Sequence, residues 1–239
     1  MALPLQDFFT AAPPVGLVHP FPGRRLTLID RKERPMVLPP RDHTISRADA
    51  ARLIARFHQD GAKEHGAAFQ RGPIVALLSQ SGCTGIRIYY ARHENGTPAL
   101  VLAGIDRHIT DLTRIVLESD YPCPSFDAWT DAAVSALRGP AVPSRDHDIS
   151  ATAAGVLTRR YRETVGREKG GAFHGDQLRA LLNQPGCHGL RIYLGQHSTG
   201  RLATILVGVG PNDRALTEHM MELHYPCPPV CGEYSELNS

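Results

Sequence analysis

Residues 82–89 read Gly-Cys-Thr-Gly-Ile-Arg-Ile-Tyr, and residues 186–193 read Gly-Cys-His-Gly-Leu-Arg-Ile-Tyr. The match continues without gaps on both sides, so that residues 42–124 align with residues 146–228 at a constant offset of 104 positions. Self-similarity at a fixed offset is typical of repeated structural units. We therefore expect an internal duplication, and a function that suits two copies of one scaffold.

Each unit opens with patterns typical of two helices. Ser46 can cap the first helix, and Asp49 stands at its third position, as in a capping box. Apolar residues at helical spacing follow and keep their register in the second copy: Ala50, Leu53, Ile54 and Phe57, then Ala154, Leu157 and Tyr161. After a glycine-rich break, a second helix is predicted around Leu77 and Leu181. Gly82 and Gly186 are expected to end it as C′ glycines.

The repeated octapeptide predicts a strand, followed by hairpin turns at Asn95-Gly96 and at residues 198–200. The return strands, 99–105 and 203–209, are apolar at nearly every position, which indicates burial on both faces. An isolated hairpin cannot supply such burial. The two hairpins are therefore expected to join, edge to edge or face to face, with helices covering the sheet.

The predicted fold class is α+β, with two helix–helix–β-hairpin–helix units, 42–125 and 146–239, in a pseudo-twofold arrangement. The third helix of each unit is predicted over 109–119 and over 214–223. Residues 126–145 are predicted to be a helical connector between the units.

Residues 1–41 hold eight of the nineteen prolines together with several large apolar side chains. Such proline density excludes a regular helix. This segment is predicted to be an extended arm that docks on its own units or on a neighbouring subunit.

Composition narrows the class of partner and the compartment. A net charge of +2 on 239 residues gives no strongly basic surface of the kind that binds nucleic acid. No apolar run approaches the roughly 20 residues that span a bilayer, and no signal peptide is recognised. Five cysteines cannot all pair, so reduced thiols are expected. We expect a cytoplasmic protein with neither nucleic-acid nor membrane partners.

The cysteines recur between the units and support alternative interpretations. Cys187, Cys227 and Cys231, with His188 as a fourth ligand, could bind zinc or iron, because Cys-x₃-Cys spacing occurs at structural zinc sites. A redox pair is a further alternative. Cys83 and Cys187 can instead be small packing residues at a tight helix-to-strand junction, in which case no cofactor is needed.

Two arginine–tyrosine pairs lie on the strand face opposite the aliphatic one. The pairs are Arg87 with Tyr89 and Arg191 with Tyr193. An arginine beside a tyrosine can bind a carboxylate or phosphate, so this face is a candidate ligand site or interface. The arginines can equally form structural salt bridges, for which Glu118 and Glu222 are matching acids. No nucleotide-binding loop or nucleophile elbow is present, and no residue is assigned a catalytic role.

The stretches 184–193 and 225–232 resemble an uncharacterised group of small, single-copy bacterial proteins. That group has a Gly-Cys-x-Gly-Ile-Arg-Ile-Tyr strand and a Cys-Pro-Pro-x-Cys-Gly end. The resemblance implies neither an activity nor site residues. The first unit departs from it at Ser125-Phe126-Asp127, where the second cysteine is lost.

The predicted function is a non-catalytic structural or protein-interaction module, which assembles with itself or binds a protein partner through the arm and the duplicated sheet. The duplication, the doubly apolar strands and the lack of a catalytic motif favour it. One alternative is a metal-binding or redox-responsive protein that uses the Cys-Pro-Pro-Val-Cys end. Another is a binder of small anionic ligands, or an enzyme, that uses the Arg/Tyr face.

Overall fold

The computed structural model describes residues 37–59, 66–120, 142, 144–166, 168–222 and 224–238, all within one compact unit, Pro35–Ser239. We call the described residues up to 120 the first half and those from 142 onward the second half. Four α-helices and two antiparallel sheets are found among these residues, which confirms the mixed α+β class.

Corresponding elements of the two halves begin 104 positions apart. The first half contains α1 (Arg47–Gln59), β1 (Gly66–Gln70), α2 (Arg71–Leu78), β2 (Gly85–Arg92), β3 (Pro98–Ile105) and β4 (Asp111–Ser119). The second half contains α4 (Ala151–Thr164), β5 (Gly170–His174), α5 (Gly175–Leu182), β6 (Gly189–Gln196), β7 (Leu202–Val209), β8 (Ala215–Met221) and β9 (Tyr225–Cys227). A short 3₁₀ helix, η2 (Pro211–Asp213), joins β7 to β8.

Each sheet takes in the first strand of the other half of the chain, and the five-stranded sheet also takes in β9. The four-stranded sheet has the order β1-β6-β7-β8, and the five-stranded sheet has the order β4-β3-β2-β5-β9. Gly66 of β1 is opposite Tyr193 of β6, and Gly170 of β5 is opposite Tyr89 of β2. The octapeptide strands β2 and β6 therefore lie inside their sheets, where both edges are paired. The two halves have exchanged their first strands.

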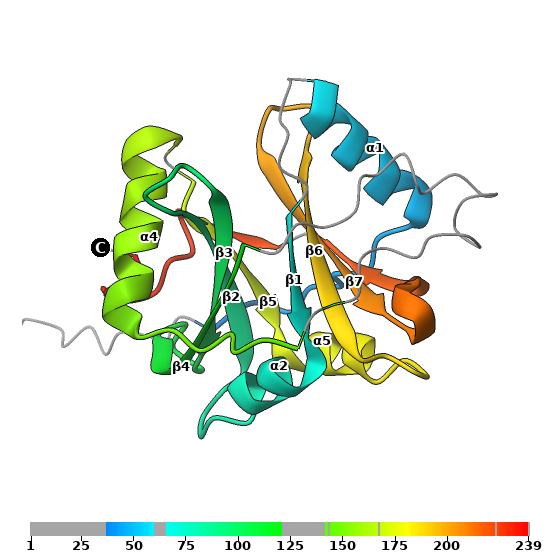
Figure 1. The fold of residues 1–239 in the computed structure, drawn as a ribbon, viewed down its shortest axis with the longest axis horizontal. Helices are drawn as coiled ribbons and strands as arrows, with labels where there is room; N and C mark the ends of the chain where they lie inside the picture. The colour runs from blue at the N-terminus through cyan, green and yellow to red at the C-terminus, as the bar shows by residue number, and fades with distance from the viewer. Residues whose placement is uncertain are drawn as a thin grey trace, which may run out of the picture. The chain divides into compact units, whose positions relative to one another are not determined.

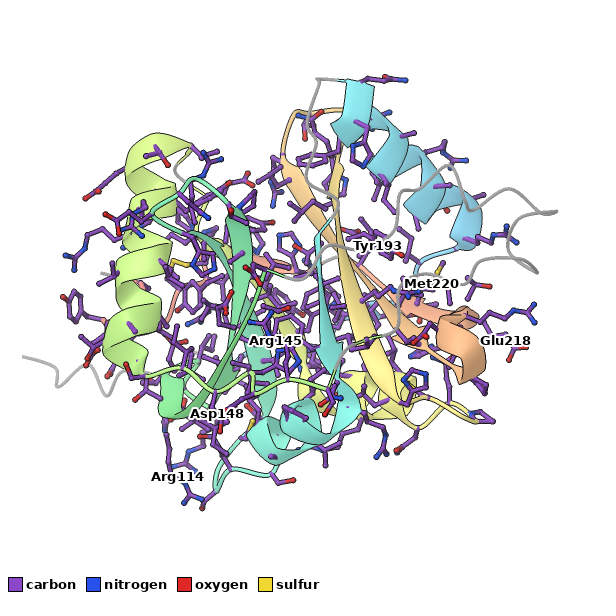
Figure 2. All side chains as sticks on the ribbon, in the orientation of Figure 1. Arg114, Arg145, Asp148, Tyr193, Glu218 and Met220 are labelled. Atoms are coloured by element: carbon purple, nitrogen blue, oxygen red, sulfur yellow. A yellow bond between two sulfur atoms is a disulfide. The ribbon has the colours of Figure 1, made fainter. Side chains whose placement is uncertain are left out.

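The opening helices are exchanged in the same way. Helix α1 packs on the sheet of the second half through Ala50 and Ile54, which contact a cluster with Tyr193 and Met220. Helix α4 packs on the sheet of the first half, where Ala154 joins the cluster of that face. Figure 1 shows α1 and α4 on opposite outer faces, and Figure 2 shows Tyr193 and Met220 beneath α1. The outer face of each sheet is therefore covered by the opening helix of the other half.

The main core lies between the two sheets. It combines aliphatic side chains of β2 and β3 with those of β6 and β7, so the two hairpins face each other. Figure 1 shows α2 and α5 together at one end of this core, near the bottom of the view. Its largest cross-half members are Ile86, Ile88, Leu102, Leu190, Ile192 and Leu206, with Phe69 and Phe173 from the exchanged strands. Burial of apolar surface at about 25 cal/mol per Å² makes this shared core the main stabilising contact.

The helix starts follow their sequence signals. The Asp49 N–H donates to Ser46 Oγ at 3.1 Å, and Ser46 Oγ donates to Asp49 Oδ2 at 2.6 Å, so the predicted capping-box residues are in contact. In α4 the Ala153 N–H donates to Ser150 Oγ at 3.2 Å. The helices predicted around Leu77 and Leu181 are also confirmed, as α2 and α5.

The predicted third helix is wrong in both halves, because residues 111–119 and 215–221 are strands. Both strands carry a register shift, between Ala103 and Gly104 on β3 and at the matching place on β7. In β4 the pairing skips residues 113–115, so the apolar residues Leu112, Ile115 and Val116 are spaced three and four positions apart. That is the spacing of a helix face.

Three further predictions need adjustment or lie outside what is described. Helix α2 ends at Leu78, so Gly82 and Gly186 belong to the following turns, where φ is +79° and +73°. The glycine-rich break contains the exchanged strands β1 and β5. Most of the arm (1–41) and of the connector (126–145) falls outside the described residues.

Candidate ligand-binding pocket

The predicted Arg/Tyr face is buried and is not an open ligand site. Arg87 is fully buried, and its Nη1 atom is 2.5 Å from Asp111 Oδ1. The Tyr89 hydroxyl donates to Asp111 Oδ2 at 2.5 Å. The structural salt bridge is therefore the alternative that applies, although its acid is Asp111 and not the expected Glu118. The face is closed because α4 packs over Tyr89 and the C-terminal segment contacts the ion pair through Val230 and Ser235.

Arg191 and Arg87 share a second structural role. Arg87 Nη2 donates to the Ile109 carbonyl at 3.0 Å, and Arg191 Nη1 donates to the Asp213 carbonyl at 2.9 Å. Ile109 and Asp213 occupy matching positions and both have positive φ, at 64° and 59°. Each arginine thus stabilises the left-handed turn that precedes an edge strand of its sheet, β4 for Arg87 and β8 for Arg191. Tyr193 is buried under α1.

The proposed thiolate ligands are not brought together. Cys227 and Cys231 form a disulfide with each other, so the expectation of reduced thiols is wrong for these two cysteines. The Cys187 thiol donates to the Gly189 carbonyl at 3.3 Å, and His188 Nε2 lies 3.8 Å from Asp213 Oδ1. Burial raises the pKa of the Cys83 and Cys187 thiols, and both pack against the main core. This placement fits the packing interpretation of those two cysteines.

A different group has the geometry of a cation site. Among the residues described, His93, Glu118 and Asp120 are the one set of three ligand types whose ligand atoms all lie within 4.8 Å of one another. Arg145, labelled in Figure 2, already places its guanidinium there, with Nη1 2.8 Å from Asp120 and Nη2 3.6 Å from Glu118. This ion pair lowers the pKa of Asp120. The arginine supplies the positive charge that a metal would bring.

Two matching histidines fasten the exchanged strands. His147 is buried, its Nδ1 is 3.0 Å from the Glu118 carbonyl, and its Nε2 accepts the Gln70 N–H at 3.4 Å. His43 makes the equivalent contacts with the Glu222 carbonyl and the His174 N–H. Because Nε2 accepts a hydrogen bond from a backbone amide, the proton must be on Nδ1 and the ring is neutral. Burial accordingly lowers the pKa of His147.

His224 is a third buried imidazole, at the position that matches Asp120. Its ring lies against Gly171, where an added Cβ would overlap it, and its centroid is 6.1 Å from that of Phe173. Burial first, and then neighbouring positive charges such as Arg201, lower the pKa of His224 from 6.5 to about 3. The folded protein therefore holds this ring uncharged at neutral pH.

Acid is expected to destabilise the protein through His224. The unfolded chain takes up this proton near pH 6.5 and the folded chain only near pH 3, so stability is full above 6.5 and is lost as pH falls toward 3. At about pH 4.5 the loss of unfolding free energy from this residue is about 3 kcal/mol. We expect urea unfolding to show that the free energy of unfolding falls between pH 7 and about pH 4.5 in the wild type. In His224→Gln this fall should be smaller by about 3 kcal/mol. His188→Gln, at an exposed ring, should keep the full loss, and an unchanged loss in His224→Gln would contradict the assignment.

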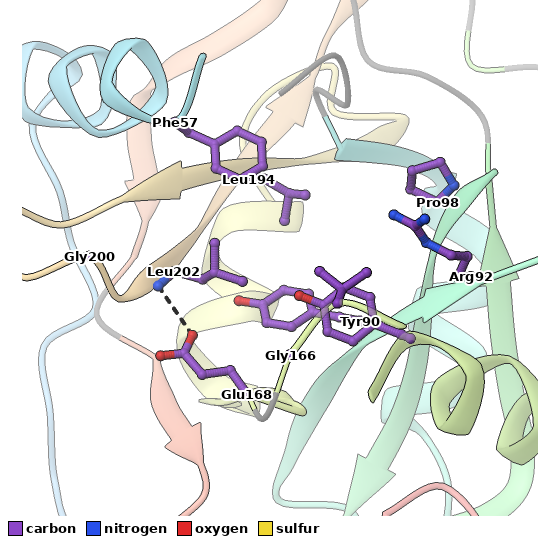
Figure 3. A pocket seen from close by; sticks show the side chains of 11 residues that line it. Phe57, Tyr90, Arg92, Pro98, Gly166, Glu168, Leu194, Gly200 and Leu202 are labelled. Carbon is purple, nitrogen blue, oxygen red and sulfur yellow. Dashed lines mark hydrogen bonds between the residues drawn. The ribbon is translucent and has the colours of Figure 1, made fainter. Parts of the chain in front are cut away.

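A pocket of about 330 Å³ at the hairpin-tip end of the molecule is not explained by folding (Figure 3). The two halves supply side chains at matching positions: Tyr90 with Leu194, Phe57 with Tyr161, and Pro98 with Leu202. These residues come from the ends of the opening helices and from the hairpins of both sheets. The exchange of elements between the halves therefore builds the pocket.

The polar groups of the pocket are few and differ between the halves. The Tyr90 hydroxyl is 3.1 Å from Thr204 Oγ1, and burial raises the pKa of Tyr90, so the phenol stays protonated. Glu168 Oε2 accepts the Leu202 N–H at 3.1 Å, as the dashed line in Figure 3 marks. Arg92 lines the wall near Pro98. A mostly apolar cavity with a few fixed polar groups is typical of a small-molecule site.

The sequence did not point to this pocket. Tyr90 continues the aliphatic face of the octapeptide strand, which predicts a core residue, and Arg92 stands next to a turn. The sequence does carry one signal, which is that the two halves differ at these positions. The second half has Leu194 in place of Tyr90 and Gln196 in place of Arg92. Such differences between corresponding positions of the two halves indicate positions that are free to serve a ligand.

Comparison of the chain with family models, with curated proteins and with solved structures finds no match. In the part of the chain that the structure describes, no helix is both long enough and apolar enough to cross a membrane.

Proposed function

We propose that this protein is a non-catalytic binder of small, largely apolar molecules, built by duplication of one unit in a pseudo-twofold arrangement. The observation that carries the proposal is the pocket of about 330 Å³, to which both halves contribute matching residues. That volume lies at the lower end of the range of known small-molecule sites. It suits a ligand of one or two rings.

The chemistry of the walls supports binding more than catalysis. The aromatic side chains Phe57, Tyr90 and Tyr161 offer flat apolar surface, and Leu194 and Leu202 add aliphatic surface to the lining. The half-buried Cys83 and Cys187 thiols do not line the pocket, and burial raises their pKa values. The interaction with a protein partner predicted from the sequence stays a prediction, since the arm on which it depends lies mostly outside the described residues.

The two-ring fluorescent probe 1-naphthylamine, which is uncharged at neutral pH, tests the proposal. The wild-type protein should bind one equivalent with a rise in fluorescence, and Leu194→Trp should weaken binding at least about tenfold, because the indole fills part of the cavity. Thermal melting verifies that the variant is folded.

Val156→Trp is the matched control, since Val156 is exposed on α4 and does not line the pocket. It should bind the probe as the wild type does. Equal affinity of the wild type and Leu194→Trp, or no binding by the wild type, would count against the pocket as a ligand site.

A further inference from the structure

Resting on the proposed function, we infer that the ligand of this pocket is a small monocarboxylate with an apolar body, and that the Arg92 guanidinium binds its carboxylate. Three features of the pocket point to this chemical class: the Arg92 side chain, the charge of the opposite wall and the difference between the two halves.

Arg92 has a buried donor with no partner. Its Nε atom is shielded from solvent and makes no hydrogen bond with any residue that the structure describes, which is also true of Arg87 Nε. Arg87 lies five residues earlier on the same strand, on the opposite face, and its Nη atoms donate to Asp111, to a tyrosine hydroxyl and to two carbonyls. An unsatisfied buried donor is costly in a folded protein, more so when it is charged. A bound anion would pair the guanidinium charge where Arg92 lines the pocket.

The backbone that carries Arg92 is fixed, while its side chain remains available. Arg92 is the last residue of β2 and is opposite Pro98 of β3. Arg160 of α4 donates to the Arg92 carbonyl at 3.4 Å, which ties the strand end to the helix. Figure 3 shows the guanidinium beside Pro98 and turned toward the pocket. A guanidinium held in this way presents a planar pair of donors that matches the two oxygens of a carboxylate.

The carboxylate on the opposite wall of the pocket disfavours a ligand with two negative charges. Glu168 lines the pocket, and its Oε1 atom is 4.0 Å from Arg201 Nε, at the limit of an ion pair. A phosphate monoester carries close to two negative charges at neutral pH and would be repelled by this carboxylate. A monocarboxylate would form an ion pair with this one arginine, and its apolar body would pack against the aromatic walls.

The second half offers no equivalent of Arg92. Gln196 occupies the matching position, and its carbonyl accepts a hydrogen bond from Arg56 of α1 at 3.1 Å, as the Arg92 carbonyl does from Arg160. The anchoring of the backbone is thus retained in both halves and only the charge is lost. The pocket therefore has one anion position, at the Arg92 end, and one ligand orientation.

The matched probes 2-naphthoate and 2-naphthamide, which differ only in the charged group, test this inference by isothermal titration calorimetry. The wild type should bind the naphthoate about 10- to 100-fold more tightly than the amide, as expected for a hydrogen bond to a charged group. Arg92→Gln, which installs the residue of the second half, should bind both probes with the affinity of the amide. Arg114→Gln removes an exposed arginine (Figure 2) and should keep the wild-type preference.

The outcomes separate the inference from the proposed function. Equal binding of the two probes by the wild type, or an undiminished preference in Arg92→Gln, would overturn the carboxylate assignment while leaving a ligand pocket in place. Tighter binding of 1-naphthyl phosphate than of the naphthoate would overturn the choice of a single charge. Failure of every probe, including the uncharged naphthylamine, would overturn the proposed function itself.

Discussion

Replacing Asp111 with alanine is expected to lower the free energy of unfolding by about 3–5 kcal/mol, the range for breaking a buried ion pair from one side. Both side chains of the pair are fully buried, so the Arg87 guanidinium would be left charged and without its carboxylate. The Tyr89 hydroxyl would lose its acceptor as well. Burial and the Asp111 charge raise the pKa of Tyr89, so this phenol remains a donor.

A double-mutant cycle distinguishes a buried pair from two independent side chains. Arg87→Met together with Asp111→Ala should cost clearly less than the sum of the single variants, because no charge is then left buried. Chemical unfolding of all four proteins gives the coupling energy. Asp148→Ala, at an exposed aspartate labelled in Figure 2, should change stability by no more than about 0.5 kcal/mol. Additive costs, or a cost below about 1 kcal/mol for Asp111→Ala, would show that the pair does not stabilise the fold.

Replacing Gly170 with alanine is expected to destabilise the protein by more than about 4 kcal/mol, or to prevent folding. Gly170 starts the exchanged strand β5 with φ +147°, a conformation that favours glycine. An added Cβ would overlap the Ile88 carbonyl oxygen and come within 2.8 Å of the Ile88 carbonyl carbon. Both atoms are backbone atoms of the paired strand β2, so no side chain can move aside. Gly66 has the same relation to Ile192 of β6, and the same result is expected there.

The matched control is Gly72→Ala in α2, where an added Cβ meets nothing within 4 Å. Alanine has the higher helix propensity, so this variant should be as stable as the wild type or up to about 1 kcal/mol more stable. Thermal melts of the three proteins make the comparison. A Gly170→Ala protein that melts with the wild type would mean that β5 does not pass this close to β2, and would contradict the exchange of strands.

Local signals in the sequence predicted the local structure well. Ser46 and Asp49 marked the start of α1, and the apolar spacing around Leu77 marked α2. The apolar return strand predicted a strand with both faces covered, and β3 has that environment. These features depend on residues within one turn or one hairpin of each other, which a periodic pattern can report.

Longer-range features could not be predicted in this way. The exchange of β1 and β5 depends on which of two similar sheets each strand joins, and both choices satisfy the same apolar pattern. Strand β4 was mistaken for a helix because Leu112, Ile115 and Val116, around the skipped residues, are spaced three and four positions apart like a helix face. A local irregularity of this kind is set by the neighbouring strand and leaves no periodic signal.

The predicted site failed for a related reason. Arg87 and Tyr89 were placed on an outward face because polar residues alternate with aliphatic ones along the strand. The opening helix of the other half covers that face, and Asp111 neutralises the arginine within it. Arg92 resembles any charged residue next to a turn, and only the three-dimensional placement of Phe57, Tyr161 and Leu202 around it shows a pocket.

A crystal structure of the protein soaked with 2-naphthoate is the most direct test of the claim that the exchanged halves build an anion-selective pocket. We predict the naphthyl ring between Tyr90, Leu194 and Leu202, with the carboxylate within hydrogen-bond distance of the Arg92 guanidinium. An empty pocket at a saturating concentration, or a probe bound only elsewhere, would contradict the claim.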